Sequence, residues 1–139
     1  NKFKIKKKVI NYSNINNAEK KIIFELKKNK IHIICLAGFM KILTRNFIKK
    51  FIGKILNIHP SLLPKYKGLK THQRVISNSE KYSGCTVHYV SSKLDSGSII
   101  LQKKVKIFKY DNYKKLKKRI LKQEHFLYPK ALKKVLSNF

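Results

Sequence analysis

Apolar residues follow the period of a helix in some stretches of the chain and form unbroken runs in others. Over 18–29 they fall three and four positions apart, which is the spacing of one helix face. Asn17 precedes this stretch and is placed to cap a helix there. The run over 31–36 is continuous and rich in β-branched residues, which is typical of a buried parallel strand. The first regular elements are therefore expected to be a helix and then a strand.

The next part of the chain predicts a parallel strand–helix–strand unit. Thr44 can cap a short helix over 44–51, whose apolar residues share one face. Gly53 ends this helix before a second short strand over 54–58. Two strands joined by one helix in so few residues suit a parallel pair with a right-handed crossover.

The second half of the chain predicts two helices and a pair of antiparallel strands. The loop over 91–97 between those strands has a length that suits a hairpin. Asp111 can cap the last helix, which Pro129 is expected to kink or to divide from 130–136. The expected elements are a helix over 71–78, strands over 84–90 and 98–108, and a last helix over 111–126.

Together these elements predict a single α/β domain over 1–139. Residues 1–17 are polar and basic, and only Val9 and Ile10 suggest a short edge strand there. With 139 residues, of which 42% are hydrophobic and 29% charged, the chain can bury a core of its own. We expect a Rossmann-like, mostly parallel sheet flanked by helices, with a C-terminal antiparallel hairpin.

The formal net charge of +28 comes from 34 Lys and Arg against 6 Asp and Glu, a balance often found in nucleic-acid-binding proteins. Only Arg45, Arg74 and Arg119 are arginines, however, and the lysines recur along the whole chain. A bias in residue usage explains this pattern better than a binding patch, so no specific nucleic acid partner is expected. A basic nucleic-acid-binding domain is the alternative from another class, and a steep salt dependence of binding would reveal it.

The two cysteines indicate a reducing compartment. Cys35 and Cys85 lie in apolar runs without metal-ligand spacing, so we expect small buried thiols and a cytoplasmic protein. The sequence shows no secretory signal and no apolar run long enough to cross a membrane. The expected partners are therefore small molecules, with no membrane.

The stretch 55–68 carries the most site-like pattern of the chain. An apolar run delivers Asn57 and His59 two residues apart, so in an extended backbone both side chains point to the same side. Pro60 pushes His59 out of the helical region, which places the pair at the end of a strand. Strand ends in open α/β sheets are where ligands bind.

Asp95 differs from the other five acids because neither helix capping nor an obvious ion pair explains it. It lies beside Gly97 in the loop between the two antiparallel strands. A loop carboxylate can reach an imidazole at a neighbouring strand end and favour its charged form. Asn57, His59 and Asp95 would then supply a hydrogen-bond donor, a proton-transfer group and its orienting carboxylate. A polar turn network without a catalytic role is the alternative that the spacing leaves open.

Two segments carry a family resemblance. Residues 57–64, reading Asn-Ile-His-Pro-Ser-Leu-Leu-Pro, resemble the signature of the folate-dependent formyltransferases. Residues 94–97, reading Leu-Asp-Ser-Gly, are similar to the second signature of that family and stand at a matching distance. The resemblance implies that Asn57, His59 and Asp95 are the catalytic residues.

The flanking segments 36–43 and 68–72 are similar to the branch of this family that acts in purine biosynthesis. That resemblance implies formyl transfer from 10-formyltetrahydrofolate, a cosubstrate, to the amine of glycinamide ribonucleotide on the route to IMP, without a metal. It also implies that Glu124 holds the ribose hydroxyls. The folate pocket that it implies comprises Met40, Lys41, Ile42, Leu43, Asn57, Val90, Ser91 and Asp95.

Each of these implied contacts has a plainer alternative. Met40 is otherwise an ordinary core residue, and Glu124 a solvated helix acid. His72, His88 and His125 are expected at most to support the site.

The chain departs from the family pattern at its start. The family opens with a βα unit whose Gly-rich turn binds phosphate, and the five glycines here are too far apart for such a turn. We therefore expect the C-terminal two-thirds of a formyltransferase domain, with the first βα unit missing, and weak or no activity alone. Turnover comparable to that of a full-length enzyme would contradict this. A relative that hydrolyses formyltetrahydrofolate or formylates another amine is the alternative within the family.

Overall fold

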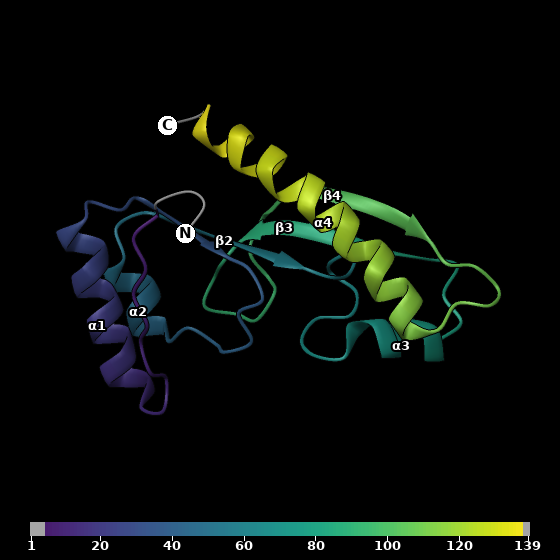
Figure 1. The fold of residues 1–139 in the computed structure, drawn as a ribbon, viewed down its shortest axis with the longest axis horizontal. Helices are drawn as coiled ribbons and strands as arrows, with labels where there is room; N and C mark the ends of the chain where they lie inside the picture. The colour runs from purple at the N-terminus through teal and green to yellow at the C-terminus, as the bar shows by residue number, and fades with distance from the viewer. Residues whose placement is uncertain (1–4, 138–139) are drawn as a thin grey trace.

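The computed structural model describes residues 5–137, which form four helices and four strands (Figure 1). Their order and type agree with the prediction, except that Val9 and Ile10 do not form the expected edge strand. The first four residues of the polar segment 1–17 lie outside the described residues. The elements are α1 (Ile15–Lys28), β1 (Ile33–Leu36), α2 (Arg45–Lys50), β2 (Lys54–His59), α3 (Thr71–Ser77), β3 (Tyr82–Tyr89), β4 (Ile99–Lys106) and α4 (Tyr113–Leu136).

The four strands form one mixed sheet in the order β1-β2-β3-β4. The parallel pair β1 and β2 and the antiparallel hairpin of β3 and β4 are confirmed, as is the α/β class. However, β2 and β3 are also antiparallel, so a mostly parallel sheet is wrong for the described strands. The segment 60–81, with α3, stays near the end of β2 instead of crossing back over the sheet, and β3 must therefore run the opposite way (Figure 1).

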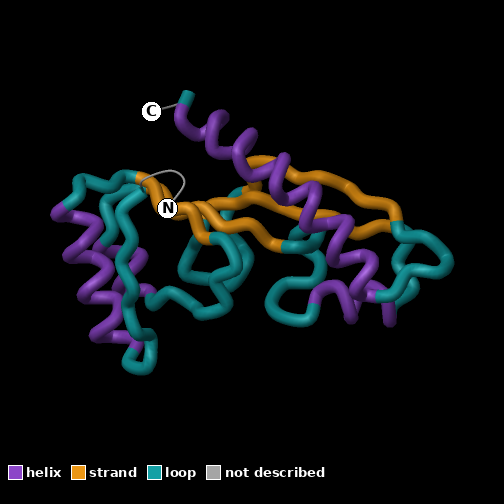
Figure 2. The backbone as a smooth tube through the Cα atoms, in the orientation of Figure 1, coloured by secondary structure: helices purple, strands orange, loops and turns teal. Residues whose placement is uncertain are grey.

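Helices cover both faces of this sheet, because β2 alternates its side chains between two cores. Leu56 belongs to the core that includes α4, and its neighbour Ile55 belongs to the core that includes α1 and α2. Figure 1 shows α4 lying along β3 and β4, with α1 and α2 together at the other end of the molecule. The strands lie between these two groups of helices (Figure 2).

β1 is less buried than its apolar run suggests. It is the first strand in the sheet order, and its Cys35 is exposed, so the expectation of a buried thiol is wrong at this position. Cys85 of β3 is fully buried as expected, and burial raises the pKa of its thiol to about 12.

One of the three predicted helix caps is confirmed. Thr44 caps α2, and its hydroxyl accepts a backbone N–H of the first turn. In contrast, α1 begins earlier than expected because Asn14 caps it. The backbone N–H of Asn17 donates to the side-chain oxygen of Asn14, so Asn17 lies inside the first turn and is not the cap. Asn112 takes the capping position of α4 in place of Asp111, whose carboxylate is bound instead by an arginine of that helix.

α4 runs through Pro129 as one helix of 24 residues, so the expected division at this proline is wrong. A proline inside a helix costs about 3 kcal/mol, because one backbone hydrogen bond is lost. Here the sheet holds the helix in place: Leu127 is buried, and the Tyr128 hydroxyl lies 2.8 Å from the carbonyl oxygen of Leu36 and 3.1 Å from that of Leu56. None of the helices in 5–137 is both long enough and apolar enough to cross a membrane.

Candidate active site

Asn57, His59 and His88 lie on one face of the paired strands β2 and β3. Asn57 and His59 are two residues apart in β2 and so share a face, as predicted. The antiparallel register sets Asn57 directly opposite His88 of β3. Strand alternation and register therefore gather three polar side chains on the face that turns away from α4.

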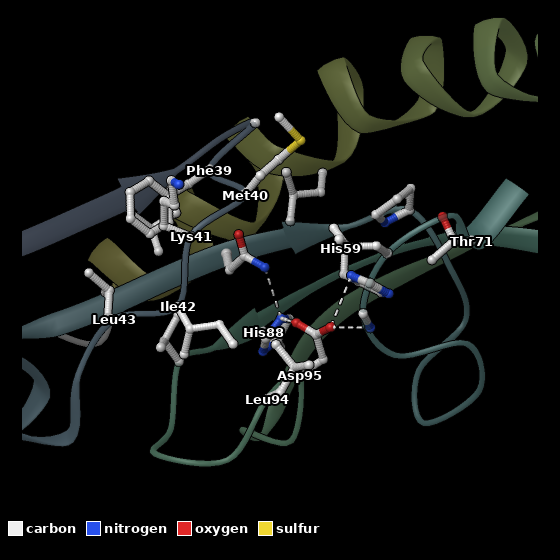
Figure 3. Close-up of a pocket in the computed structure, with 18 of the residues that line it drawn as sticks. Phe39, Met40, Lys41, Ile42, Leu43, His59, Thr71, His88, Leu94 and Asp95 are labelled. Carbon is white, nitrogen blue, oxygen red and sulfur yellow. Dashed lines mark hydrogen bonds and ion pairs between the residues drawn. The ribbon is translucent and has the colours of Figure 1, made fainter. Parts of the chain in front are cut away.

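The loop after β3 brings Asp95 over these strands. Its backbone is left-handed (φ 44°), and Gly97 passes so close to β3 that a Cβ there would lie 1.7 Å from the Tyr89 carbonyl oxygen. The Asp95 carboxylate accepts a hydrogen bond from the N–H of Gly68 (2.8 Å) and lies 3.3 Å from Nδ1 of His59 (Figure 3). Only 8% of the Asp95 side chain is exposed, and its catalytic role, against a polar turn network without one, stays a prediction.

Both ring nitrogens of His59 face acceptors. Nδ1 faces the Asp95 carboxylate, and Nε2 donates to the backbone carbonyl of Tyr66 at 2.8 Å. A doubly protonated imidazole satisfies both. Tyr66 has a left-handed backbone (φ 57°), and its hydroxyl donates to Glu80 at 2.9 Å. The loop that follows β2 thus returns to hold the histidine with which that strand ends.

His88 has a larger part in this geometry than its sequence context suggests. Its Nδ1 donates to the Tyr89 carbonyl (2.8 Å), which leaves Nε2 to accept the amide N–H of Asn57 (3.3 Å). Burial lowers the pKa of His88, although the Tyr89 carbonyl and Asp95 oppose this, so the ring is neutral at pH 7. Asp95 lies 3.8 Å from Nε2, beyond hydrogen-bond distance. His88 therefore orients the Asn57 carboxamide.

A cavity of about 450 Å³ opens beside this cluster (Figure 3). Met40 is 80% exposed and lines the cavity, so the alternative of core packing is wrong for this residue. The cavity includes every residue of the pocket expected from the sequence, and what these residues bind stays a prediction. They are Met40, Lys41, Ile42, Leu43, Asn57, Val90, Ser91 and Asp95.

α3 and α4 contribute further polar side chains to the cavity. Glu124 of α4 lines it and is half-buried, so it is not simply a solvated helix acid. Burial raises the pKa of Glu124, while His125 and Lys117 oppose that shift. His72 of α3 also lines the cavity, whereas His125 is exposed and does not. His125 therefore takes no part in lining this cavity.

The described part of the chain, 5–137, has no group of three or more His, Cys, Asp or Glu side chains arranged to hold a metal ion. The expectation that no metal is required stays a prediction.

The formyl transferase family model matches residues 1–132 of the chain. A phosphoribosylglycinamide formyltransferase of Haemophilus influenzae is 46% identical over 123 residues, which are 88% of this chain and 58% of that protein. The trifunctional purine biosynthetic protein adenosine-3 of Chironomus tentans is 50% identical over 115 residues, 83% of this chain and 8% of that protein. The crystal structure of phosphoribosylglycinamide formyltransferase from Campylobacter jejuni is 30% identical, with a TM-score of 0.88 over 97% of this chain and 71% of that one.

Proposed function

The chain belongs to the formyl transferase family, and we propose on that basis that it transfers a formyl group from 10-formyltetrahydrofolate to the amine of glycinamide ribonucleotide in purine biosynthesis. The names of its relatives support formyl transfer to this acceptor. In this proposal the protein is a cytoplasmic enzyme with small-molecule substrates.

One observation carries the proposal: Asn57, His59 and Asp95 converge at the wall of a single cavity. A carboxamide beside an imidazole that is paired with a carboxylate can serve acyl transfer to an amine. These groups provide an N–H donor for the oxygen that gains charge and a paired cation close to it.

The formyl donor is proposed to occupy the part of the cavity formed by Met40–Leu43 and Val90–Ser91. Two of these side chains, Met40 and Ile42, are apolar and exposed, by 80% and 64%. Exposed apolar side chains around a cavity suit a flat, largely apolar ligand.

The proposed reaction begins when the acceptor amine attacks the formyl carbon. A C–N bond forms, and the C=O electron pair moves to oxygen. Asn57 has a second amide N–H besides the one bound to His88, and it donates this N–H to the oxygen. His59 is bound through Nε2 to Tyr66, so it stabilises the oxyanion by its positive charge. The electron pair on oxygen then re-forms the C=O bond as the bond from the formyl carbon to N10 breaks, and N10 takes the electron pair of that bond and the proton that the amine releases.

Replacement of Ile42 by glutamate tests the assignment of the donor. A carboxylate at position 42 would lose its hydration when the donor binds against it, and this costs free energy. We therefore expect the Kd for 10-formyltetrahydrofolate to rise at least about 10-fold. Fluorescence titration measures the Kd. The matched control is Ile52→Glu, because Ile52 is 86% exposed and does not line the cavity. Equal Kd values for the two variants would contradict the assignment.

Replacement of His88 by phenylalanine tests the orientation of Asn57. The amide N–H of Asn57 loses its acceptor, and such a loss costs about 1–3 kcal/mol, so kcat/KM should fall about 10- to 100-fold. Steady-state kinetics measure this, with the exposed His125→Phe as the control. A His88 variant as active as the His125 variant would show that Asn57 needs no such partner.

The acceptor is tested by omitting or replacing glycinamide ribonucleotide. We expect transfer to this amine to exceed both release of formate to water and transfer to other amines. Equal rates without the ribonucleotide would instead favour a formyltetrahydrofolate-hydrolysing relative, and equal rates with another amine would favour a different acceptor.

A further inference from the structure

His72 lines the cavity but has no role in the proposed reaction. It is the second residue of α3 and lines the cavity together with Lys117 and Glu124 of α4. Figure 3 places its neighbour Thr71 on the far side of His59 from Met40–Leu43, the segment proposed to hold the donor. His72 follows Thr71 directly in α3, and the charge of Lys117 acts on it, so it has a polar neighbour in the cavity.

The Nδ1 atom of His72 is buried and has no hydrogen-bond partner among residues 5–137. The only other such side-chain atom in that range is Oγ of Ser83, which does not line the cavity. An orphaned buried polar atom costs about 1–3 kcal/mol. The torsion about Cβ–Cγ of histidine is soft, so the ring of His72 can rotate at the cavity wall that it lines. A ligand N–H at this wall would supply the missing partner.

The ionisable groups beside Asn57, namely His59, His88 and Asp95, are already engaged within the protein. Both ring nitrogens of His59 and both of His88 have protein partners. The Asp95 carboxylate accepts a backbone N–H and faces His59. Among the imidazoles of the cavity, His72 is thus the one that keeps a ring nitrogen for a ligand.

The surroundings of His72 favour its neutral form. Burial lowers the pKa of His72, and the positive charges of Lys117 and His59 lower it further. A neutral imidazole carries one lone pair and can accept a hydrogen bond from an amine or amide N–H. That capacity matches the acceptor substrate, whose reacting group is an amine.

We infer that His72 binds the acceptor substrate by accepting, on Nδ1, a hydrogen bond from one of its N–H groups. This inference rests on the proposed function and adds a substrate contact to it. His72 thereby helps to hold the amine beside the formyl carbon.

Two substitutions separate this contact from a structural role. His72→Phe keeps a flat ring but removes the acceptor, so the KM for glycinamide ribonucleotide should rise about 10-fold or more while the Kd for 10-formyltetrahydrofolate changes less than about twofold. His72→Asn places an amide oxygen near the position of Nδ1, so it should recover part of the loss. The inference is wrong if both variants change the KM for glycinamide ribonucleotide and the Kd for 10-formyltetrahydrofolate by the same factor. It is also wrong if His72→Phe leaves the KM for glycinamide ribonucleotide unchanged.

¹⁵N NMR of the chain with ¹⁵N-labelled histidine provides a readout that does not depend on turnover. We expect glycinamide ribonucleotide to shift the Nδ1 signal of His72 and 10-formyltetrahydrofolate to shift the signals of His59 and His88. If the donor shifts its signals but the ribonucleotide leaves His72 unmoved, the inference fails and the proposed function stands. If neither substrate shifts any histidine signal, the proposed function itself fails.

Discussion

Asp95→Ala is expected to lower the rate of formyl transfer by about two to four orders of magnitude, the range for positioned acid–base and charge-stabilising groups. The Asp95 carboxylate faces Nδ1 of His59 at 3.3 Å and accepts the Gly68 N–H at 2.8 Å, with both side chains almost fully buried. Without it, the imidazolium loses its counterion, and the loop over 94–97 loses its tie to the loop that follows β2.

Kinetics and thermal unfolding of three variants distinguish this loss from a general loss of structure. Asp95→Asn removes the charge and keeps the shape, so its rate should fall nearly as far as that of the alanine variant. Asp111→Ala is the control, because Asp111 is a buried carboxylate bound to Arg119 outside the cavity. A rate for Asp95→Ala within a few-fold of the Asp111 control would contradict the assignment.

His59→Ala is the second substitution with a large expected effect, again about 100- to 10,000-fold in rate. In the proposed reaction this substitution removes the positive charge next to the formyl oxygen, and it leaves the Asp95 carboxylate buried without its partner. The exposed His125→Ala should change the rate little and serves as the matched control.

The double variant His59→Ala with Asp95→Ala shows whether the two residues act as one unit. Because they contact each other, we expect its rate to be about that of the slower single variant. If the two losses multiply, His59 and Asp95 contribute separately, and the pairing proposed for them is wrong.

The centre of the site could be predicted from the sequence because its features are local. The period of a strand puts Asn57 and His59 on one side, and Pro60 ends the strand at that point. Asp95 was recognisable because, at its position in the loop, neither helix capping nor an obvious ion pair explains a carboxylate. The structure brings Asp95 and His59 into contact as expected.

The partners of these residues could not be predicted in the same way, because they depend on contacts between distant segments. His88 meets Asn57 only through the register of β2 and β3, which the sequence of either strand alone does not give. The alternation of β3 places His88 and Thr86 on the same face of that strand. If β3 had been paired with β2 in the correct register, His88 would have been identified as the partner of Asn57. The Tyr66 carbonyl reaches His59 through a left-handed backbone at a bulky residue, for which the sequence gives no signal.

The errors in the fold have the same origin. The direction of β3 depends on where the 60–81 segment packs, and local pattern does not determine this. Likewise, Pro129 is tolerated inside α4 because the sheet holds Leu127 and Tyr128 on the turn beside it. Local propensity predicted a kink or a division there, and tertiary contacts prevented the division.

The central claim is that the groups around this one cavity carry a formyl group from a folate donor to an amine. It is tested most directly with 10-formyltetrahydrofolate carrying a ¹³C-labelled formyl group, incubated with glycinamide ribonucleotide and an equimolar amount of the chain, so that mass spectrometry records even one slow turnover. We expect the label in formylglycinamide ribonucleotide, at a rate that falls at least about 100-fold in Asp95→Ala. Label found only in formate, or product formed equally fast by the Asp95 variant, would contradict the claim.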